Sequence, residues 1–354
     1  MKKTLKRMLP VAGLTLGVLL LFLLLAKPVV EEFFQEDRLV SFNGDTVVCA
    51  IAVDDKPLSR SAGGLIAGLN MDLIRRCSRI DSFEVRFVRP RKEESLVEGL
   101  ESGRYDLLVA PEDSLTGTSF RRVPAAGEGV VWALAPHHRD KADSLENWLG
   151  GYMKTEDFTA DSARFSCVRT PRKAVANGWK LSRISPYDDA IRAAARELGW
   201  DWRLLSALIF TESKFSITAE SHRGAFGLMQ IVPEDGDRDR LLDPYQSIEQ
   251  GKNHLKRLQR LFRARGVESG PALQQITVAA YNAGEGRIID LMTLADTLGY
   301  HPGLWENLAT VIPLMATHAD SIETVAIGRF RGGETLAYVD SVFTVYSFYQ
   351  QLIR

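Results

Sequence analysis

The fold of this chain is decided by one segment, Leu204-Leu205-Ser206-Ala207-Leu208-Ile209-Phe210-Thr211-Glu212-Ser213. Its apolar residues recur at the three- and four-residue steps of a helix, and Glu212 occupies a position where that pattern calls for an apolar side chain. Desolvation raises the pKa of such a carboxyl, and the partial negative charge of a helix C-terminus acts in the same direction. The segment therefore predicts a helix that ends on a proton-holding general acid. A glutamate bent into solvent is the alternative, which this segment alone leaves open.

Four motifs lie in order along the second half of the chain. They read TESKF (211–215), SHRGAFGLMQIVP (221–233), AAYNAGEGR (279–287) and ETLAYV (334–339). In order and spacing they resemble the ES, GLMQ, AYNAG and ETxxYV motifs of the soluble lytic transglycosylase family. The resemblance covers about residues 185–354 and implies a mainly α-helical, lysozyme-like domain that acts on the glycan strands of peptidoglycan.

The resemblance also implies a mechanism and a set of site residues. Glu212 would protonate the oxygen between N-acetylmuramic acid and N-acetylglucosamine, and would then accept the proton of the muramic C6 hydroxyl as it closes on C1. One group that acts as acid and then as base needs no cofactor, unlike a two-carboxylate glycosidase. By position in the motifs, the residues expected to bind substrate or to brace the cleft are Ser221, Met229, Gln230, Tyr281, Asn282, Glu334 and Tyr338. For Met229 and Tyr338, core packing is the competing interpretation.

Two other functions remain open at this point. A lysozyme-type hydrolase would use water in place of the C6 hydroxyl. A non-catalytic envelope sensor or scaffold would carry an inactive domain, although the intact Glu212 disfavours this. The sequence does not decide between endo and exo action, and it gives neither protein partners nor the oligomeric state.

The first half of the chain predicts a separate α/β domain over residues 46–153. Expected strands at 46–53, 83–88, 106–110 and 129–135 alternate with expected helices near 65–76, 93–102 and 144–153, which favours a mainly parallel sheet. The turn Ser102-Gly103-Arg104-Tyr105-Asp106-Leu107 resembles one in periplasmic solute-binding domains. Only about eighteen residues separate Ala110 from Gly129, so the second lobe of such a domain is missing. We therefore expect a single solute-binding-like lobe that serves as a scaffold or docking domain.

Residues 154–184 are polar and read as a connector, after which the helical domain opens. Ser185 suits a helix N-cap, Pro186 suits the first turn, and Gly199 is expected to end this helix. The combination of a truncated lobe with Ser185-Pro186-Tyr187-Asp188 is similar to a membrane-bound branch of the transglycosylase family.

The N-terminus has the pattern of an export signal. Basic residues within 1–7 precede an uncharged apolar stretch over about 9–26, which is just long enough to span a bilayer. We expect residues 1–27 to be an uncleaved signal anchor, with cleavage as the alternative, and residues 28–45 to be a stalk. This predicts a periplasmic protein held at the inner membrane of a Gram-negative-type bacterium.

Composition excludes several classes of function. The formal net charge is −1, so no global field indicates nucleic-acid binding. Three cysteines leave at least one thiol unpaired within the chain, and spacing cannot assign a bridge. The six histidines are scattered and neither CxxC nor HExxH occurs, so the sequence predicts no metal site.

Overall fold

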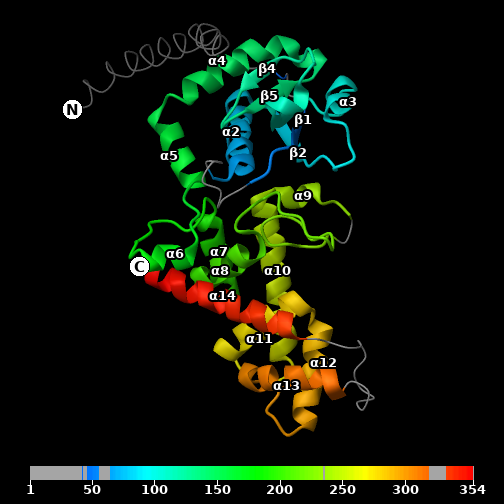
Figure 1. The fold of residues 1–354 in the computed structure, drawn as a ribbon, viewed down its shortest axis with the longest axis vertical. Helices are drawn as coiled ribbons and strands as arrows, with labels where there is room; N and C mark the ends of the chain where they lie inside the picture. Colours follow the sequence, from blue (N-terminus) through cyan, green and yellow to red (C-terminus); the bar gives the residue numbers. More distant parts are fainter. Residues whose placement is uncertain (1–41, 43–45, 56–63, 234–235, 319–331, 354) are drawn as a thin grey trace, which may run out of the picture.

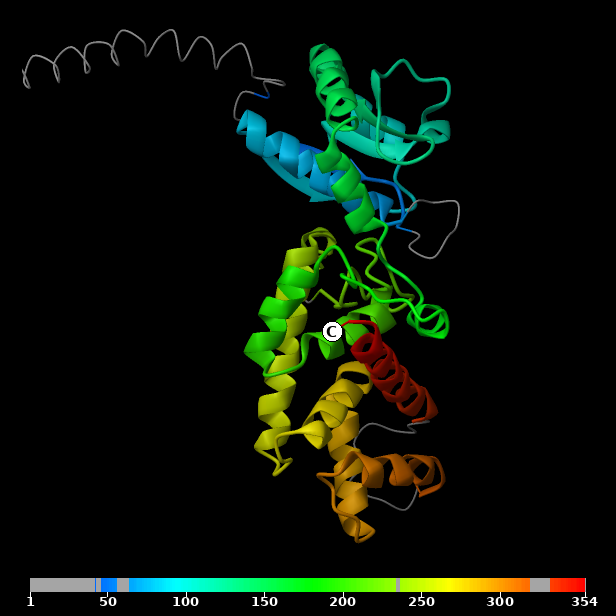
Figure 2. The same cartoon turned by 90° about the vertical axis from the view of Figure 1, so that its left-hand side faces the viewer.

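The computed structural model describes residues 42, 46–55, 64–233, 236–318 and 332–353. An α/β part lies above a helical part along the long axis of the molecule (Figure 1), and the view at 90° shows the same stacking (Figure 2). Within these ranges no helix combines the length and the apolar character that a bilayer crossing requires. The expected anchor and nearly all of the expected stalk lie outside the described residues.

The α/β part is a five-stranded sheet with the strand order β2-β1-β3-β5-β4. β1 pairs in parallel with β2 and with β3, because helices α2 and α3 carry the chain back to the start of each next strand. The elements are β1 (Thr46–Ile51), α2 (Ile66–Asp81), β2 (Glu84–Val88), α3 (Leu96–Glu101), β3 (Leu107–Pro111), β4 (Arg122–Pro124), β5 (Val130–Leu134) and α4 (Ala142–Tyr152).

The sheet is mixed, which corrects the prediction that it is mainly parallel. β5 runs antiparallel to β3, and the short strand β4, which the sequence pattern did not predict, runs antiparallel to β5. The physical reason is the length of the connection. The residues between β3 and β5 hold only a short 3₁₀ turn and β4, so no helix is available to return the chain for a parallel strand.

The expected connector, residues 154–184, contains two helices rather than an irregular linker. α5 (Glu156–Phe165) packs on α2 of the α/β part, whereas α6 (Pro171–Ala176) packs on the C-terminal helix. α5 is capped by the Thr155 hydroxyl, which accepts a hydrogen bond from the Phe158 N–H, and α6 has Pro171 in its first turn. A capping threonine marks the start of α5 and a proline marks the start of α6, whereas no apolar period marks either helix.

The described residues after 184 are mainly helical, as predicted. Gly199 ends the first of these helices in the left-handed conformation, but that helix begins at Asp188 instead of Pro186. The Asp188 carboxylate accepts hydrogen bonds from the backbone N–H groups of Ile184 and Ser185 and from the Ser185 hydroxyl, so residues 184–187 form a turn ahead of the helix. The helices are α7 (Asp188–Leu198), α8 (Trp202–Ser213), α9 (Asp239–Leu242), α10 (Pro244–Arg263), α11 (Pro271–Ala283), α12 (Glu285–Thr297), α13 (Trp305–His318) and α14 (Gly333–Leu352).

The two parts share a hydrophobic core. One continuous cluster of buried side chains runs from one face of the sheet, through Phe165 and Tyr187, to the interior of the helical part, and a second cluster covers the other face of the sheet. The contact is close at Gly68, where an added Cβ would lie 2.7 Å from the Tyr187 hydroxyl. The α/β part is therefore packed against the helical part, not merely tethered to it.

All three cysteines are free thiols. Cys49 and Cys77 are buried in the α/β part, and Cys167 is partly exposed between α5 and α6. The single bridge that three cysteines would have allowed does not form in this structure.

Candidate active site

Glu212 lies in the last turn of α8, where α8 packs against α14. α8 begins at its cap Asp201, which accepts a hydrogen bond from the Arg203 N–H, and it ends at Lys214 in the left-handed conformation. The Glu212 side chain is partly buried, and its Oε1 accepts a short hydrogen bond from the hydroxyl of Tyr338 on α14. The sequence predicted a carboxyl near the helix end, and the structure directs it toward α14.

Burial raises the pKa of Glu212 to about 7, whereas the hydrogen bond from Tyr338 acts in the opposite direction. A carboxyl with this pKa is protonated in about half of the molecules near neutral pH, and it can therefore both donate and accept a proton there. The Tyr338 bond occupies Oε1. This leaves Oε2 to carry the transferable proton.

Tyr281 on α11 completes the group around Glu212. Burial, and then the nearby charge of Glu212, raise its pKa well above the usual range, as they do for Tyr338. The Tyr281 hydroxyl donates a 2.6 Å hydrogen bond to the backbone carbonyl of Met229. Two neutral tyrosines therefore flank the carboxyl, and one of them is fixed to the loop that carries Gln230.

A groove of about 670 Å³ opens beside Tyr281, which is within the usual size of a small-ligand site. Gln230 and the two residues after it line one side of the groove, and α10 lines much of the rest through Gln250, Asn253, His254 and Arg257. The His254 ring meets the Tyr281 ring edge to face at 5.4 Å. The groove places hydrogen-bonding side chains next to Tyr281, whose pKa the charge of Glu212 raises.

The loop that carries Gln230 is held from several sides. The Ser213 hydroxyl donates to the Leu228 carbonyl at 2.7 Å, and the Ser247 hydroxyl accepts from the Met229 N–H at 3.2 Å. Gly227 has a φ of +76°, and a Cβ there would lie 2.4 Å from the Leu241 carbonyl oxygen, so the turn has room only for glycine. The loop is thus fixed relative to the end of α8.

Gln230 lines this groove, and Asn282 follows Tyr281 on α11. The Gln230 amide nitrogen donates to the carbonyls of Ala219 and Gly227, both at 3.0 Å, so its amide oxygen is the group left to face a ligand. Asn282 accepts a 3.1 Å hydrogen bond from the Thr335 hydroxyl, which ties the end of α11 to the start of α14. Asn282 therefore braces the helices that carry Tyr281 and Tyr338.

Three other predicted residues do not line this groove. The Met229 side chain is fully buried and packs against Gly251, so it belongs to the core, and only its carbonyl reaches the site. The Ser221 hydroxyl accepts from the N–H groups of Arg223 and Ala225, so it closes a turn at a different groove. Glu334 is exposed in the first turn of α14.

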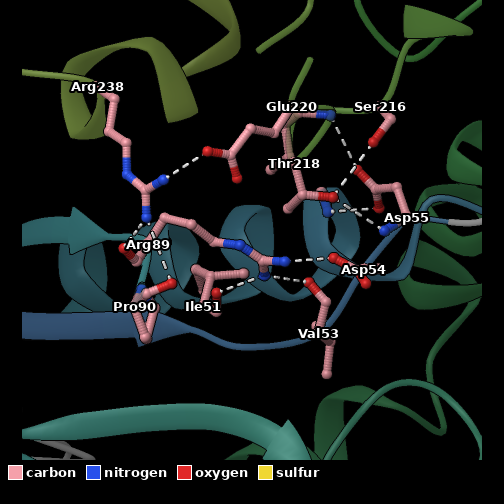
Figure 3. A network of polar contacts seen from close by, with 12 residues as sticks. Ile51, Val53, Asp54, Asp55, Arg89, Pro90, Ser216, Thr218, Glu220 and Arg238 are labelled. Carbon is pink, nitrogen blue, oxygen red and sulfur yellow. Dashed lines mark hydrogen bonds and ion pairs between the residues drawn. The ribbon is translucent and has the colours of Figure 1, made fainter. Parts of the chain in front are cut away.

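Sequence reasoning missed the contact between the two parts, which starts directly after Glu212. Asp55 follows β1 in the α/β part, and its carboxylate accepts hydrogen bonds from the backbone N–H of Ile217 at 3.0 Å and of Gly68 at 3.2 Å. The Asp55 N–H donates in turn to the Thr218 hydroxyl (Figure 3). The only signal in the sequence was a pair of aspartates after a buried strand.

Arginines extend this contact on either side of a second groove of about 1010 Å³. Arg238 donates to Glu220 and to the backbone carbonyls of Arg89 and Pro90 (Figure 3). Arg89 donates to Asp54 and to the carbonyls of Ile51, at the end of β1, and Val53. The α/β part thus holds the segment that leads from Glu212 to the Gln230 loop.

Comparison with known proteins gives this geometry a context. Residues 189–300 match the family model of the transglycosylase SLT domain. The chain is 32% identical over 174 residues to membrane-bound lytic murein transglycosylase F of Desulfosudis oleivorans, which covers 48% of this chain and 37% of the relative. It is 31% identical over 281 residues to the protein of the same name from Shewanella pealeana, which covers 73% of this chain and 56% of the relative.

The chain therefore spans about half the length, or less, of these curated relatives. Among solved structures, it is similar to an inactive mutant of the lytic transglycosylase Slt from Pseudomonas aeruginosa, at 19% identity and a TM-score of 0.32, over 60% of this chain and 33% of the other.

Proposed function

We propose that this chain, in which residues 189–300 form a transglycosylase SLT domain, is a peptidoglycan lytic transglycosylase. It would cleave the β-1,4 bond between N-acetylmuramic acid and N-acetylglucosamine and leave a 1,6-anhydro end on the muramic residue. The observation that carries the proposal is the Glu212 carboxyl, whose pKa is raised by burial to about 7 and whose charge acts on Tyr281, a residue that lines a groove of about 670 Å³.

The chemistry needs one proton donor that becomes a base. Protonated Glu212 gives its proton to the glycosidic oxygen as the bond to C1 breaks, and the charge that develops at C1 is oxocarbenium-like. The resulting carboxylate takes the proton of the C6 hydroxyl while that oxygen bonds to C1. The proton count closes, because Glu212 ends protonated as it began and no water is consumed.

Tyr338 has a defined part in this cycle. Its hydroxyl donates to Glu212 Oε1, and a donor of this kind stabilises the carboxylate form that exists after the first proton transfer. Tyr281 acts on the other side, where its bond to the Met229 carbonyl holds the Gln230 loop against the groove. We propose Glu212 as the catalytic residue and Gln230 and Tyr281 as substrate contacts, with Tyr338 and Asn282 as positioning residues.

A two-carboxylate mechanism has less support. Among the described residues, the groups that shift the pKa of Glu212 are its buried surroundings and Tyr338, and no second carboxylate is among them. Glycosidases that recruit water or a protein nucleophile use a pair of carboxyl groups on either side of the scissile bond. A single acid suits a reaction in which the substrate supplies its own nucleophile.

The setting of the enzyme is part of the proposal. We propose a helical catalytic domain over 185–354 and a single solute-binding-like lobe over 46–153, with 154–184 between them. The apolar stretch at 9–26 would hold the protein at the periplasmic face of the inner membrane, where peptidoglycan strands are accessible. The fixed contact between lobe and helical part favours a scaffold over a mobile ligand clamp.

The decisive test is product analysis by mass spectrometry after digestion of purified peptidoglycan. Muropeptides with 1,6-anhydro ends are expected, and they should be absent when Glu212→Gln replaces the parent protein. Reducing muramic ends in the parent digest would mean that water is the nucleophile, and the lysozyme-type alternative would replace the proposal. Equal product from Glu212→Gln and the parent would remove Glu212 from its role.

A further inference from the structure

Two histidines and an aspartate lie close together in the α/β part, at the end of the sheet where β3 begins. His137 and His138 lie in the 3₁₀ turn at Pro136–Lys141, shortly after β5, and Asp106 directly precedes β3. The antiparallel pairing of β3 with β5 sets Leu107 opposite Leu134, so it brings the residues before one strand next to those after the other. Strand register, and not proximity in the sequence, assembles this cluster.

The ligand atoms have the spacing of a metal site. Nε2 of His137 lies 2.9 Å and Nε2 of His138 lies 3.5 Å from the same oxygen, Oδ1 of Asp106. All three side chains offer atoms within 4.8 Å of one another, and the two ring centroids are 4.2 Å apart. Zinc bonds of about 2.0–2.1 Å in a tetrahedral site put neighbouring ligand atoms about 3.3 Å apart. The observed distances lie on either side of that value.

The surroundings hold two of the three side chains in place. The second oxygen of Asp106 accepts a 2.8 Å hydrogen bond from the Val48 N–H, which orients the carboxylate from behind as outer contacts do in metal sites. The His138 ring packs edge to face on Phe42 at 4.9 Å. The Asp106 and His138 side chains are 14% and 17% exposed, whereas His137 is 51% exposed. A fixed pair and an accessible third ligand leave an entry path for an ion.

We propose that Asp106, His137 and His138 bind one divalent transition-metal ion, for which zinc is the best match. Imidazole and carboxylate ligands suit zinc, nickel and copper, and water would complete the coordination of a three-residue site. The ion would fasten the turn after β5 to the start of β3 and so stabilise the α/β part. None of the three residues lines either of the two grooves described above, so the inference is independent of the proposed catalysis. The sequence analysis predicted no metal site. It missed this cluster because Asp106 is far from the two histidines along the chain.

The test is isothermal titration of the full chain with Zn²⁺, after purification in detergent and dialysis against a chelator. We expect one equivalent to bind with a Kd of about 10 μM or tighter, and the melting temperature to rise when zinc is present because the ion binds the folded state. Co²⁺ is expected to bind to the same three ligands in place of Zn²⁺, and the complex should show the visible absorption of a four-coordinate cobalt ion. No saturable binding at one equivalent would overturn the proposal and leave two imidazoles hydrogen-bonded to a carboxylate.

Variants assign the ligands. His137→Gln combined with His138→Gln should weaken Zn²⁺ binding at least tenfold, and Asp106→Asn should weaken it less, because the amide oxygen can still accept from Val48. His301→Gln is the matched control, since it removes an exposed histidine in the helical part and should leave the affinity unchanged. The exposed single variant His137→Gln is included in case the double variant does not fold. Full affinity in a folded His137→Gln variant would contradict the assignment.

Discussion

Glu212 is a partly buried carboxyl and Asp55 a buried one, and burial raises the pKa of both, to about 7 and about 6. Their partners differ. Asp55 accepts hydrogen bonds from two backbone N–H groups that belong to different parts of the chain, whereas Glu212 accepts one from the hydroxyl of Tyr338. Burial alone therefore does not identify a catalytic acid. The difference lies in whether both carboxyl oxygens are committed to the backbone or one is left to transfer a proton.

The largest expected effect is on catalysis. Glu212→Gln keeps the size of the side chain and its hydrogen bond from Tyr338 but removes the transferable proton. We expect kcat/KM on purified peptidoglycan to fall by at least about 10³-fold, since no other group takes over the proton. Glu306→Gln, the same change at an exposed position on α13, is the control and should keep full activity.

The same variant should not lose stability. Removing a carboxyl whose ionisation in the fold is unfavourable leaves the free energy of unfolding unchanged or increased above pH 7. A large loss in the free energy of unfolding of Glu212→Gln would mean that this carboxyl stabilises the fold, as Asp55 does. The proposed difference between the two carboxyls would then be wrong.

The next largest effect is expected at the contact between the two parts. Asp55→Ala leaves the buried N–H groups of Gly68 and Ile217 without their acceptor, so we expect a loss of about 2–4 kcal/mol in the free energy of unfolding. The neighbouring change Asp54→Ala removes only an ion pair with Arg89, and Asp54 is 57% exposed, so its cost should stay below about 1 kcal/mol. Denaturant melts of both variants measure the difference, and equal losses would contradict it.

The pH dependence of stability gives a smaller effect with a defined sign. The pKa of Asp55 is raised from 3.8 to about 6 in the folded chain, so the fold holds this proton more tightly than the unfolded chain does. The stabilisation is complete below about pH 4 and is lost as the pH rises through 6, to the extent of about 2–3 kcal/mol. Between about pH 4 and pH 6, the free energy of unfolding should fall less for Asp55→Ala than for the parent protein. If the free energy of unfolding has the same pH dependence in both proteins, the raised pKa of Asp55 is contradicted.

The smallest expected effect is on the pKa of Glu212. Tyr338→Phe removes a hydrogen bond that lowers the pKa of Glu212, so the pH at which activity falls with loss of the Glu212 proton should move upward. We expect about a tenfold loss in kcat as well, because the carboxylate formed in the first step loses its donor. Tyr346→Phe is the control on the same helix, where the tyrosine donates to Asp201 instead, and its pH profile should match that of the parent.

The sequence was sufficient for the elements whose signal is local. Strands β1, β2, β3 and β5, the helix that carries Glu212 and the end of α7 at Gly199 could be predicted, because apolar period and glycine act over a few residues. The mixed sheet could not, because the direction of β5 depends on what fits between β3 and β5. α5 and α6 were also missed, since their stability comes from packing on distant helices.

In the candidate site, too, the sequence predicted the residues with a local motif and missed the features that depend on distant contacts. The motifs predicted Glu212, Tyr281 and Tyr338, which the fold brings together. They could not tell that the Met229 side chain faces the core or that Ser221 closes a turn, because both properties depend on which way one loop folds. The Asp55 contact joins residues more than 160 positions apart, and no short pattern carries that information.

The central claim is that Glu212, in the last turn of α8, titrates near neutral pH. The most direct measurement is a pH titration of the side-chain carboxyl ¹³C shifts of glutamate-labelled protein, with Glu212→Gln used to assign the resonance. We predict a midpoint near 7 for Glu212 in the parent and a higher one in Tyr338→Phe. A midpoint close to the ordinary glutamate value of about 4.3 would contradict the claim, since the group would then be a carboxylate when it has to act as an acid.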